Sequence, residues 1–170
     1  MLHDALSLAE TGPVVIRYPK GNARQVAERE VVSGLTARRM SADPGKGLCI
    51  LAVGKMVAAA EQAVAALARD NVPATLWDVR ACVPADDAMI RDAAAHRCVL
   101  TLEDGIRDGG IGFLLADAVT AIAPSRAPII RVLGLPTRFI PHAKPDVILA
   151  KLGLDAAGVE RSAREVLATK

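Results

Sequence analysis

The chain has 170 residues and a mass of 17.8 kDa, so it has the size of one domain and is too short for a multidomain enzyme. Hydrophobic residues make up 52% and charged residues 24%, a composition that predicts a globular rather than a disordered chain. The formal net charge of +2 lacks the basic excess of nucleic-acid-binding proteins, and no secretory leader or long apolar span is recognisable, so we expect a cytoplasmic protein without nucleic-acid or membrane partners.

The first part of the chain does not look self-contained. Apolar residues at helical spacing predict a short helix at the start, and the apolar residues 14–18 then predict a strand that ends in a Pro-Lys-Gly-Asn turn. Because a strand needs neighbours, we assign residues 1–22 to the end of a preceding domain and expect the chain to be part of a longer protein. Residues 23–46 are charged and lack a sustained period, which predicts a linker with one edge strand near residues 35–40.

Residues 47–170 alternate between apolar strands and amphipathic helices, which predicts a single α/β domain. The predicted strands are residues 48–53, 74–79, 98–102 and 129–133. The first predicted helix contains Val57, the second begins after Asp86 or Asp87, and the third contains Leu115 to Ile122. The last two helices begin at Pro145 and after Asp155, and Gly153 is the predicted C-cap between them. Strands that alternate with helices are joined by crossovers, so the sheet should be mainly parallel and covered on both faces.

The sequence offers no self-contained catalytic or metal site. The three cysteines, Cys49, Cys82 and Cys98, form no C-x-x-C pair and are expected to be reduced, buried thiols. The three histidines are far apart and lack a metal-ligand spacing, and no serine lies in a nucleophile motif. We therefore predict no catalytic residue, no metal and no cofactor bound by this chain alone.

A glycine-rich loop, residues 103–112, stands between a predicted strand and a predicted helix, where α/β proteins bind ligands. As a dinucleotide-binding fingerprint it fails, because Leu115 occupies the place of the third glycine and two acids precede the loop. We interpret the glycines as a tight turn into a helix whose positive end the acids complement. The alternative is a contact with a neighbouring domain or subunit. The residues considered for that contact are Glu103, Asp104, Gly109, Gly110, Gly112 and the loop residue His142.

A small cationic cluster follows the predicted strand 14–18. Arg17 and Lys20 flank a Tyr-Pro pair at its end, where they suit a phosphate or a carboxylate. Two exposed cations beside a turn are more often simply solvated, so from composition alone both readings stay open.

Four segments together resemble the C-terminal part of the 1-deoxy-D-xylulose-5-phosphate synthases, thiamine-diphosphate enzymes of the transketolase family. They are residues 12–22, 51–54, 101–112 and the pair 133–142 with 152–158. The last pair, Leu-Pro-x-Arg-Phe-Ile-x-His followed by Leu-Gly-Leu-Asp, is the most particular to these synthases. The resemblance implies a three-layer α/β fold of the transketolase C-terminal type, with one antiparallel edge strand in a mainly parallel sheet.

The resemblance also implies a role. The family decarboxylates pyruvate on thiamine diphosphate and joins the two-carbon fragment to glyceraldehyde 3-phosphate, in isoprenoid precursor synthesis. In the family, the N-terminal domain holds the diphosphate of the cofactor and Mg²⁺, and the central domain supplies the glutamate that activates the cofactor. Most of that machinery is absent here, so this part would support a homodimer and be inactive alone. Lys20 matches the family residue that binds the substrate phosphate, where Arg is usual, and Arg17 matches a supporting arginine. Ala81, Val83 and Ala143 differ from the residues that the family tends to have.

Two other functions remain open from the sequence. One is the partner-binding C-terminal module of another transketolase-type enzyme, such as a 2-oxoacid dehydrogenase beta subunit. The Leu-Gly-Leu-Asp tail, residues 152–155, argues against it. The other is a stand-alone regulatory α/β protein, which the unpaired strand at residues 14–18 argues against.

Overall fold

The centre of the molecule is a five-stranded sheet with the order β1-β3-β2-β4-β5. The computed structural model describes residues 2–18, 25–28, 31 and 34–169. Its strands are β1 (Arg38–Ser41), β2 (Leu48–Ala52), β3 (Thr75–Asp78), β4 (Cys98–Ile106) and β5 (Ile129–Leu135). The edge strand β1 pairs antiparallel with β3, and the other neighbours pair parallel. The predicted mainly parallel sheet with one antiparallel edge strand is thereby confirmed.

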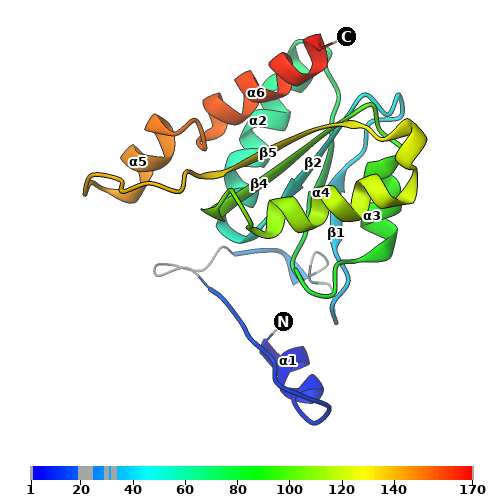
Figure 1. The fold of residues 1–170 in the computed structure, drawn as a ribbon, viewed down its shortest axis with the longest axis vertical. Helices are drawn as coiled ribbons and strands as arrows, with labels where there is room; N and C mark the ends of the chain where they lie inside the picture. Colours follow the sequence, from blue (N-terminus) through cyan, green and yellow to red (C-terminus); the bar gives the residue numbers. More distant parts are fainter. Residues whose placement is uncertain (1, 19–24, 29–30, 32–33, 170) are drawn as a thin grey trace.

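Helices cover both faces of the sheet and make it the middle of three layers (Figure 1). One face carries α2 (Val57–Arg69) and α6 (Ala156–Ala168), and the other carries α3 (Asp87–Ala94) and α4 (Ile111–Ile122). Two short helices, α1 (Leu2–Leu8) and α5 (Pro145–Lys151), lie outside these layers. None of the described helices has the length and hydropathy that crossing a bilayer requires.

Strand β2 explains why its sequence is a continuous apolar run. All five of its residues are buried, and successive side chains point to opposite faces. Leu48, Ile50 and Ala52 pack in the core beneath α2 and α6. Cys49 and Leu51 pack in the core beneath α3 and α4. A strand between two helical layers therefore has no polar face.

The helix ends follow the predicted capping residues. Asp86 accepts hydrogen bonds from two N–H groups in the first turn of α3, at 2.8 and 3.0 Å, and Asp155 accepts one in α6 at 2.9 Å. At the end of α5, Gly153 has a φ of 70°, and the next N–H, of Leu154, donates to the carbonyl of Leu149 at 2.8 Å. This is the Schellman arrangement that the sequence predicted with Gly153 as C-cap.

The predicted strand at residues 14–18 is wrong for this structure. Residues 13–18 have no regular secondary structure, because no neighbouring strand within the described residues is placed to pair with them. The predicted edge strand at residues 35–40 forms, displaced along the chain, as β1. The assignment of residues 1–22 to a preceding domain and of 23–46 to a linker stays a prediction.

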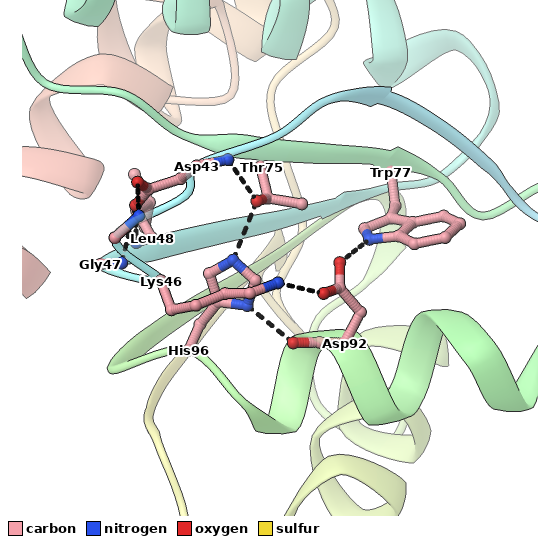
Figure 2. Close-up of polar contacts among 9 residues, drawn as sticks. Asp43, Lys46, Gly47, Leu48, Thr75, Trp77, Asp92 and His96 are labelled. Carbon is pink, nitrogen blue, oxygen red and sulfur yellow. Dashed lines mark hydrogen bonds and ion pairs between the residues drawn. The ribbon is translucent and has the colours of Figure 1, made fainter.

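A buried polar network holds the edge of the sheet where β2 and β3 begin (Figure 2). Asp43, which is buried, accepts hydrogen bonds from the backbone N–H groups of Gly45 at 2.8 Å and Gly47 at 2.7 Å. These contacts close the turn that leads into β2. The N–H of Asp43 itself donates to the hydroxyl of Thr75 at 2.8 Å, which joins this turn to the first residue of β3.

His96 completes the same network in its neutral form. Its Nδ1 lies 2.7 Å from the carbonyl oxygen of Asp92, and its Nε2 lies 2.9 Å from Oγ1 of Thr75. A carbonyl only accepts, so Nδ1 carries the proton and Nε2 accepts from the Thr75 hydroxyl. Burial lowers the pKa of His96, which favours this neutral form. The carboxylate of Asp92 in turn accepts from Nε1 of Trp77 at 2.9 Å and pairs with Lys46.

Candidate functional site

The candidate site lies on the opposite side of the sheet from this network, along the carboxyl ends of the parallel strands. Ligands of open α/β sheets bind outside the carboxyl ends of the strands, so this edge is where a site is expected. Three segments meet here. They are residues 13–18, the turn Gly54–Met56 that follows β2, and residues 103–110, which form the last part of β4 and the turn after it rather than the predicted loop.

An ion cluster joins these three segments through one carboxylate. Nη1 and Nη2 of Arg17 donate to the two oxygens of Asp104 at 2.9 and 3.4 Å, and Nζ of Lys55 lies 3.2 Å from Oδ2 of Asp104. Burial acts to raise the pKa of Asp104, but the hydrogen bonds from Arg17 and Lys55 outweigh burial and lower it. The cluster therefore carries two positive charges against one negative charge at neutral pH.

The side chain of Glu103 occupies the space inside the glycine-rich segment. Glu103 is only 5% exposed, and its Oε1 accepts a hydrogen bond from the N–H of Gly112 at 2.8 Å, at the start of α4. A side chain at Gly105 or Gly110 would place its Cβ 2.6 or 2.5 Å from the Glu103 oxygens. An anion thus already occupies the positive end of α4, which supports the predicted structural role of the glycines.

Helix α4 approaches the sheet closely at Gly112. A Cβ there would lie 2.6 Å from Oγ1 of Thr101 and 2.7 Å from Cγ1 of Val132. The Thr101 hydroxyl is buried and has no hydrogen-bond partner within the part of the chain that the structure describes. Helix α4 can therefore lie this close to Thr101 and Val132 only because residue 112 lacks a side chain.

Apolar side chains are exposed around the same edge. Phe139 is fully exposed, and Ile106, Val83, Leu114 and Phe113 are between 46% and 76% exposed. Ile106 and residues 135–140 also line a shallow hollow beside the end of β5. Large exposed apolar patches on soluble proteins usually mark an interaction surface.

The structure brings most of the predicted site residues together. Arg17, Glu103, Asp104, Gly110 and Gly112 meet at this edge. Gly109 turns the same segment with a φ of 81°, and His142 is exposed between β5 and α5. Lys20 lies outside the described residues, so its predicted role stays a prediction.

Sequence reasoning missed Lys55. The signal that could have found it is a cation directly after a buried parallel strand, since such strands end at the ligand-binding edge. Its contact with Asp104, 49 residues later, follows from no local pattern.

The site can attract anions and contact a partner, but its described residues hold no nucleophile or metal ligand set. Burial raises the pKa of Cys49, Cys82 and Cys98, so these residues are thiols rather than nucleophilic thiolates. Cys82 is half-buried rather than buried as expected. No group of three acidic, histidine or cysteine side chains among the described residues is arranged to hold a metal.

Comparisons with known proteins agree with this geometry. The family model described as "Transketolase, C-terminal domain" matches residues 37–159. Curated 1-deoxy-D-xylulose-5-phosphate synthases are similar to nearly the whole chain. The synthase of Paraburkholderia phymatum is 38% identical over 97% of this chain and 26% of its own length, and that of Chlorobium luteolum is 36% identical over 99% and 27%. The chain therefore spans about a quarter of the length of these relatives.

Solved structures share the fold. A structure titled "Split gene transketolase, inactive beta4 tetramer" superposes with a TM-score of 0.71 at 22% identity, over 87% of this chain and 47% of that chain. A transketolase mutant from Pichia stipitis superposes with a TM-score of 0.51 at 16% identity, over 78% of this chain and 18% of that one. At these identities the similarity establishes the fold alone.

Proposed function

Because this chain belongs to the transketolase C-terminal domain family, we propose that it is the C-terminal portion of a 1-deoxy-D-xylulose-5-phosphate synthase. The observation that carries this proposal is 32–38% identity to such synthases along 97% or more of the chain, in relatives from several bacteria. This similarity also favours a synthase over the dehydrogenase module and the stand-alone regulatory protein.

The portion supports catalysis without performing it. In such an enzyme, thiamine diphosphate and Mg²⁺ would bind to the other domains, and the cofactor would supply the chemistry that releases CO2 from pyruvate and joins the two-carbon fragment to glyceraldehyde 3-phosphate. The buried carboxylate at the strand ends, Glu103, is already bound to the backbone of α4, so we place neither cofactor nor metal on it. We expect the isolated chain to be inactive, like the inactive beta tetramer of the split-gene transketolase that shares its fold.

The chain's own residues serve the phosphorylated substrate and the assembly. Arg17 presents a guanidinium at the strand ends, and Lys20, three residues later, supplies a second cation for the substrate phosphate. The exposed apolar side chains around Phe139 and Ile106 suit a contact with the central and N-terminal domains or with a second subunit. We propose a cytoplasmic homodimer assembled in this way.

A chimeric enzyme tests the proposal. The last quarter of the Paraburkholderia phymatum synthase is replaced by this chain, and product formation from pyruvate and glyceraldehyde 3-phosphate is measured with thiamine diphosphate and Mg²⁺. We expect synthase activity from the chimera and none from the isolated chain. A folded, dimeric chimera that lacks activity, or an isolated chain that turns over both substrates, would contradict the proposal.

The role of Lys20 is tested in the same chimera. We expect Lys20→Ala to raise the KM for glyceraldehyde 3-phosphate at least about tenfold, since a lost charged hydrogen bond is worth about 1.5–3 kcal/mol, and to leave the KM for pyruvate nearly unchanged. Equal effects on the two KM values would remove Lys20 from the phosphate site.

A further inference from the structure

We propose that Asp104 is a positioning residue, which holds the guanidinium of Arg17 at the strand ends in the orientation that receives the substrate phosphate. This inference deepens the proposed function, on which it rests. The contact itself joins two residues 87 positions apart, and it links residues 13–18 to the end of strand β4.

The segment that carries Arg17 has little local structure of its own. Residues 13–18 form no helix or strand, and the side chains of Val15 and Tyr18 are 92% and 81% exposed. A segment without a hydrogen-bond ladder or a buried face depends on side-chain contacts for its position. The paired hydrogen bonds between Arg17 and Asp104, at 2.9 and 3.4 Å, supply such a contact, and their parallel geometry fixes orientation as well as distance.

Asp104 is suited to this role because it is itself fixed. It belongs to strand β4, and its side chain is only 16% exposed. The ammonium of Lys55 holds its second oxygen from the other side at 3.2 Å, and the neighbouring Glu103 is tied to α4. The carboxylate therefore offers Arg17 a fixed point on the sheet.

Arg17 remains able to bind a ligand while it is held. A guanidinium has five N–H donors, of which Asp104 occupies two, and the Arg17 side chain is 71% exposed. Among the described residues no other group takes the remaining donors, which are accessible to solvent at the edge where the substrate is expected. Holding the side chain in place before binding removes the cost of ordering it in the complex.

The replacement of Asp104 by asparagine separates positioning from simple charge. Asparagine removes a negative charge from a cluster of two cations, so electrostatic attraction alone predicts tighter phosphate binding and a lower KM. If Asp104 positions Arg17, the opposite is expected, because the amide loses the paired charged hydrogen bonds. The two explanations thus differ in the sign of the change.

The experiment uses the chimeric synthase described above and compares the KM values for glyceraldehyde 3-phosphate and pyruvate. We expect Asp104→Asn to raise the first about five- to tenfold, to leave the second and kcat within about twofold, and Asp104→Glu to recover most of the loss. The matched control is Asp108→Asn, which removes an exposed acid of the same loop that pairs with Arg107 instead. It should leave the KM for the phosphorylated substrate unchanged or slightly lower.

A second measurement tests the contact between Arg17 and Asp104 without an activity assay. In the isolated chain, the ¹H–¹⁵N heteronuclear NOE of residues 14–18 should fall in Asp104→Asn and stay unchanged in Asp108→Asn. A KM for glyceraldehyde 3-phosphate that is unchanged or lower in an active Asp104→Asn chimera would overturn this inference and leave the proposed function intact. If the unsubstituted chimera folds and dimerises but is inactive, the proposed function is contradicted instead. In that case an unchanged NOE in the Asp104→Asn chain would still show that Asp104 does not hold the segment.

Discussion

Replacing Thr75 by valine should lower the free energy of unfolding much more than the same replacement of Thr101. Both side chains are fully buried in the sheet, in β3 and in β4, with β2 between these strands. The Thr75 hydroxyl accepts from the N–H of Asp43 and donates to His96, whereas that of Thr101 has no partner among the described residues. Because valine has nearly the shape of threonine, the pair compares a bonded hydroxyl with an unbonded one.

The expected changes in the free energy of unfolding follow from the polar groups that each substitution leaves without a hydrogen-bond partner. Thr75→Val leaves the Asp43 N–H and the Nε2 of His96 buried without partners, and each such group costs about 1–3 kcal/mol. The total is about 2–6 kcal/mol, a large part of the roughly 5–15 kcal/mol that stabilises a typical domain. Thr101→Val strands no partner and removes a polar group that was buried unpaired, so stability should stay constant or rise by about 1–3 kcal/mol.

Urea unfolding of the isolated chain, followed by far-UV circular dichroism, measures both values by linear extrapolation. The single tryptophan, Trp77, gives a second probe within the network, since its Nε1 donates to Asp92. Similar losses in the two variants would refute the reasoning, because the partners of Thr75 would then contribute nothing that Thr101 lacks.

Three further stability predictions concern single contacts. Burial lowers the pKa of His96 from 6.5, so the folded chain binds this proton more weakly than the unfolded chain. The contribution of His96 is therefore complete above pH 6.5 and falls as the pH decreases below it, and urea midpoints between pH 8 and 5 should depend less on pH in His96→Gln. Gly112→Ala should cost about 1–3 kcal/mol, since its Cβ would meet Thr101 and Val132, whereas Gly12→Ala, which meets nothing within 4 Å, should change the urea midpoint little. Asp86→Ala should lower the thermal midpoint through the loss of an N-cap worth about 0.5–2 kcal/mol, and the exposed Asp87→Ala should serve as the unchanged control.

The core of the fold was predictable because local patterns determine it. A strand buried on both faces needs apolar residues throughout, which β2 has, and a helix end needs a cap, which Asp86, Gly153 and Asp155 supply. These requirements act over a few residues, so they are legible in one sequence. The antiparallel edge strand came from the family resemblance instead, and the order of the strands was not predicted, since no local pattern specifies either.

The predictions of secondary structure fail where contacts with residues far away in the sequence determine the local structure. Strand β4 continues to Ile106 although its acids and glycine resembled a loop, because Ile106 pairs with Leu135 of the neighbouring strand β5. The predicted strand at residues 14–18 has the right composition but no partner strand in the described structure. In both cases the deciding groups lie tens of residues away, beyond the reach of any periodicity.

The polar groups where the strands begin and those where the strands end are satisfied in different ways, and this difference indicates different roles for the two sides of the sheet. Where β2 and β3 begin, Asp43, Thr75 and His96 bond to one another, so nothing in that network calls for a ligand. Where the strands end, Arg17 keeps donors in solvent and Phe139 is fully exposed, so these groups contribute little to the stability of the free chain. Substitutions in the network of the first side should therefore change the free energy of unfolding of the isolated chain, whereas substitutions of the exposed Arg17 and Phe139 at the second should act mainly on assembly and substrate binding.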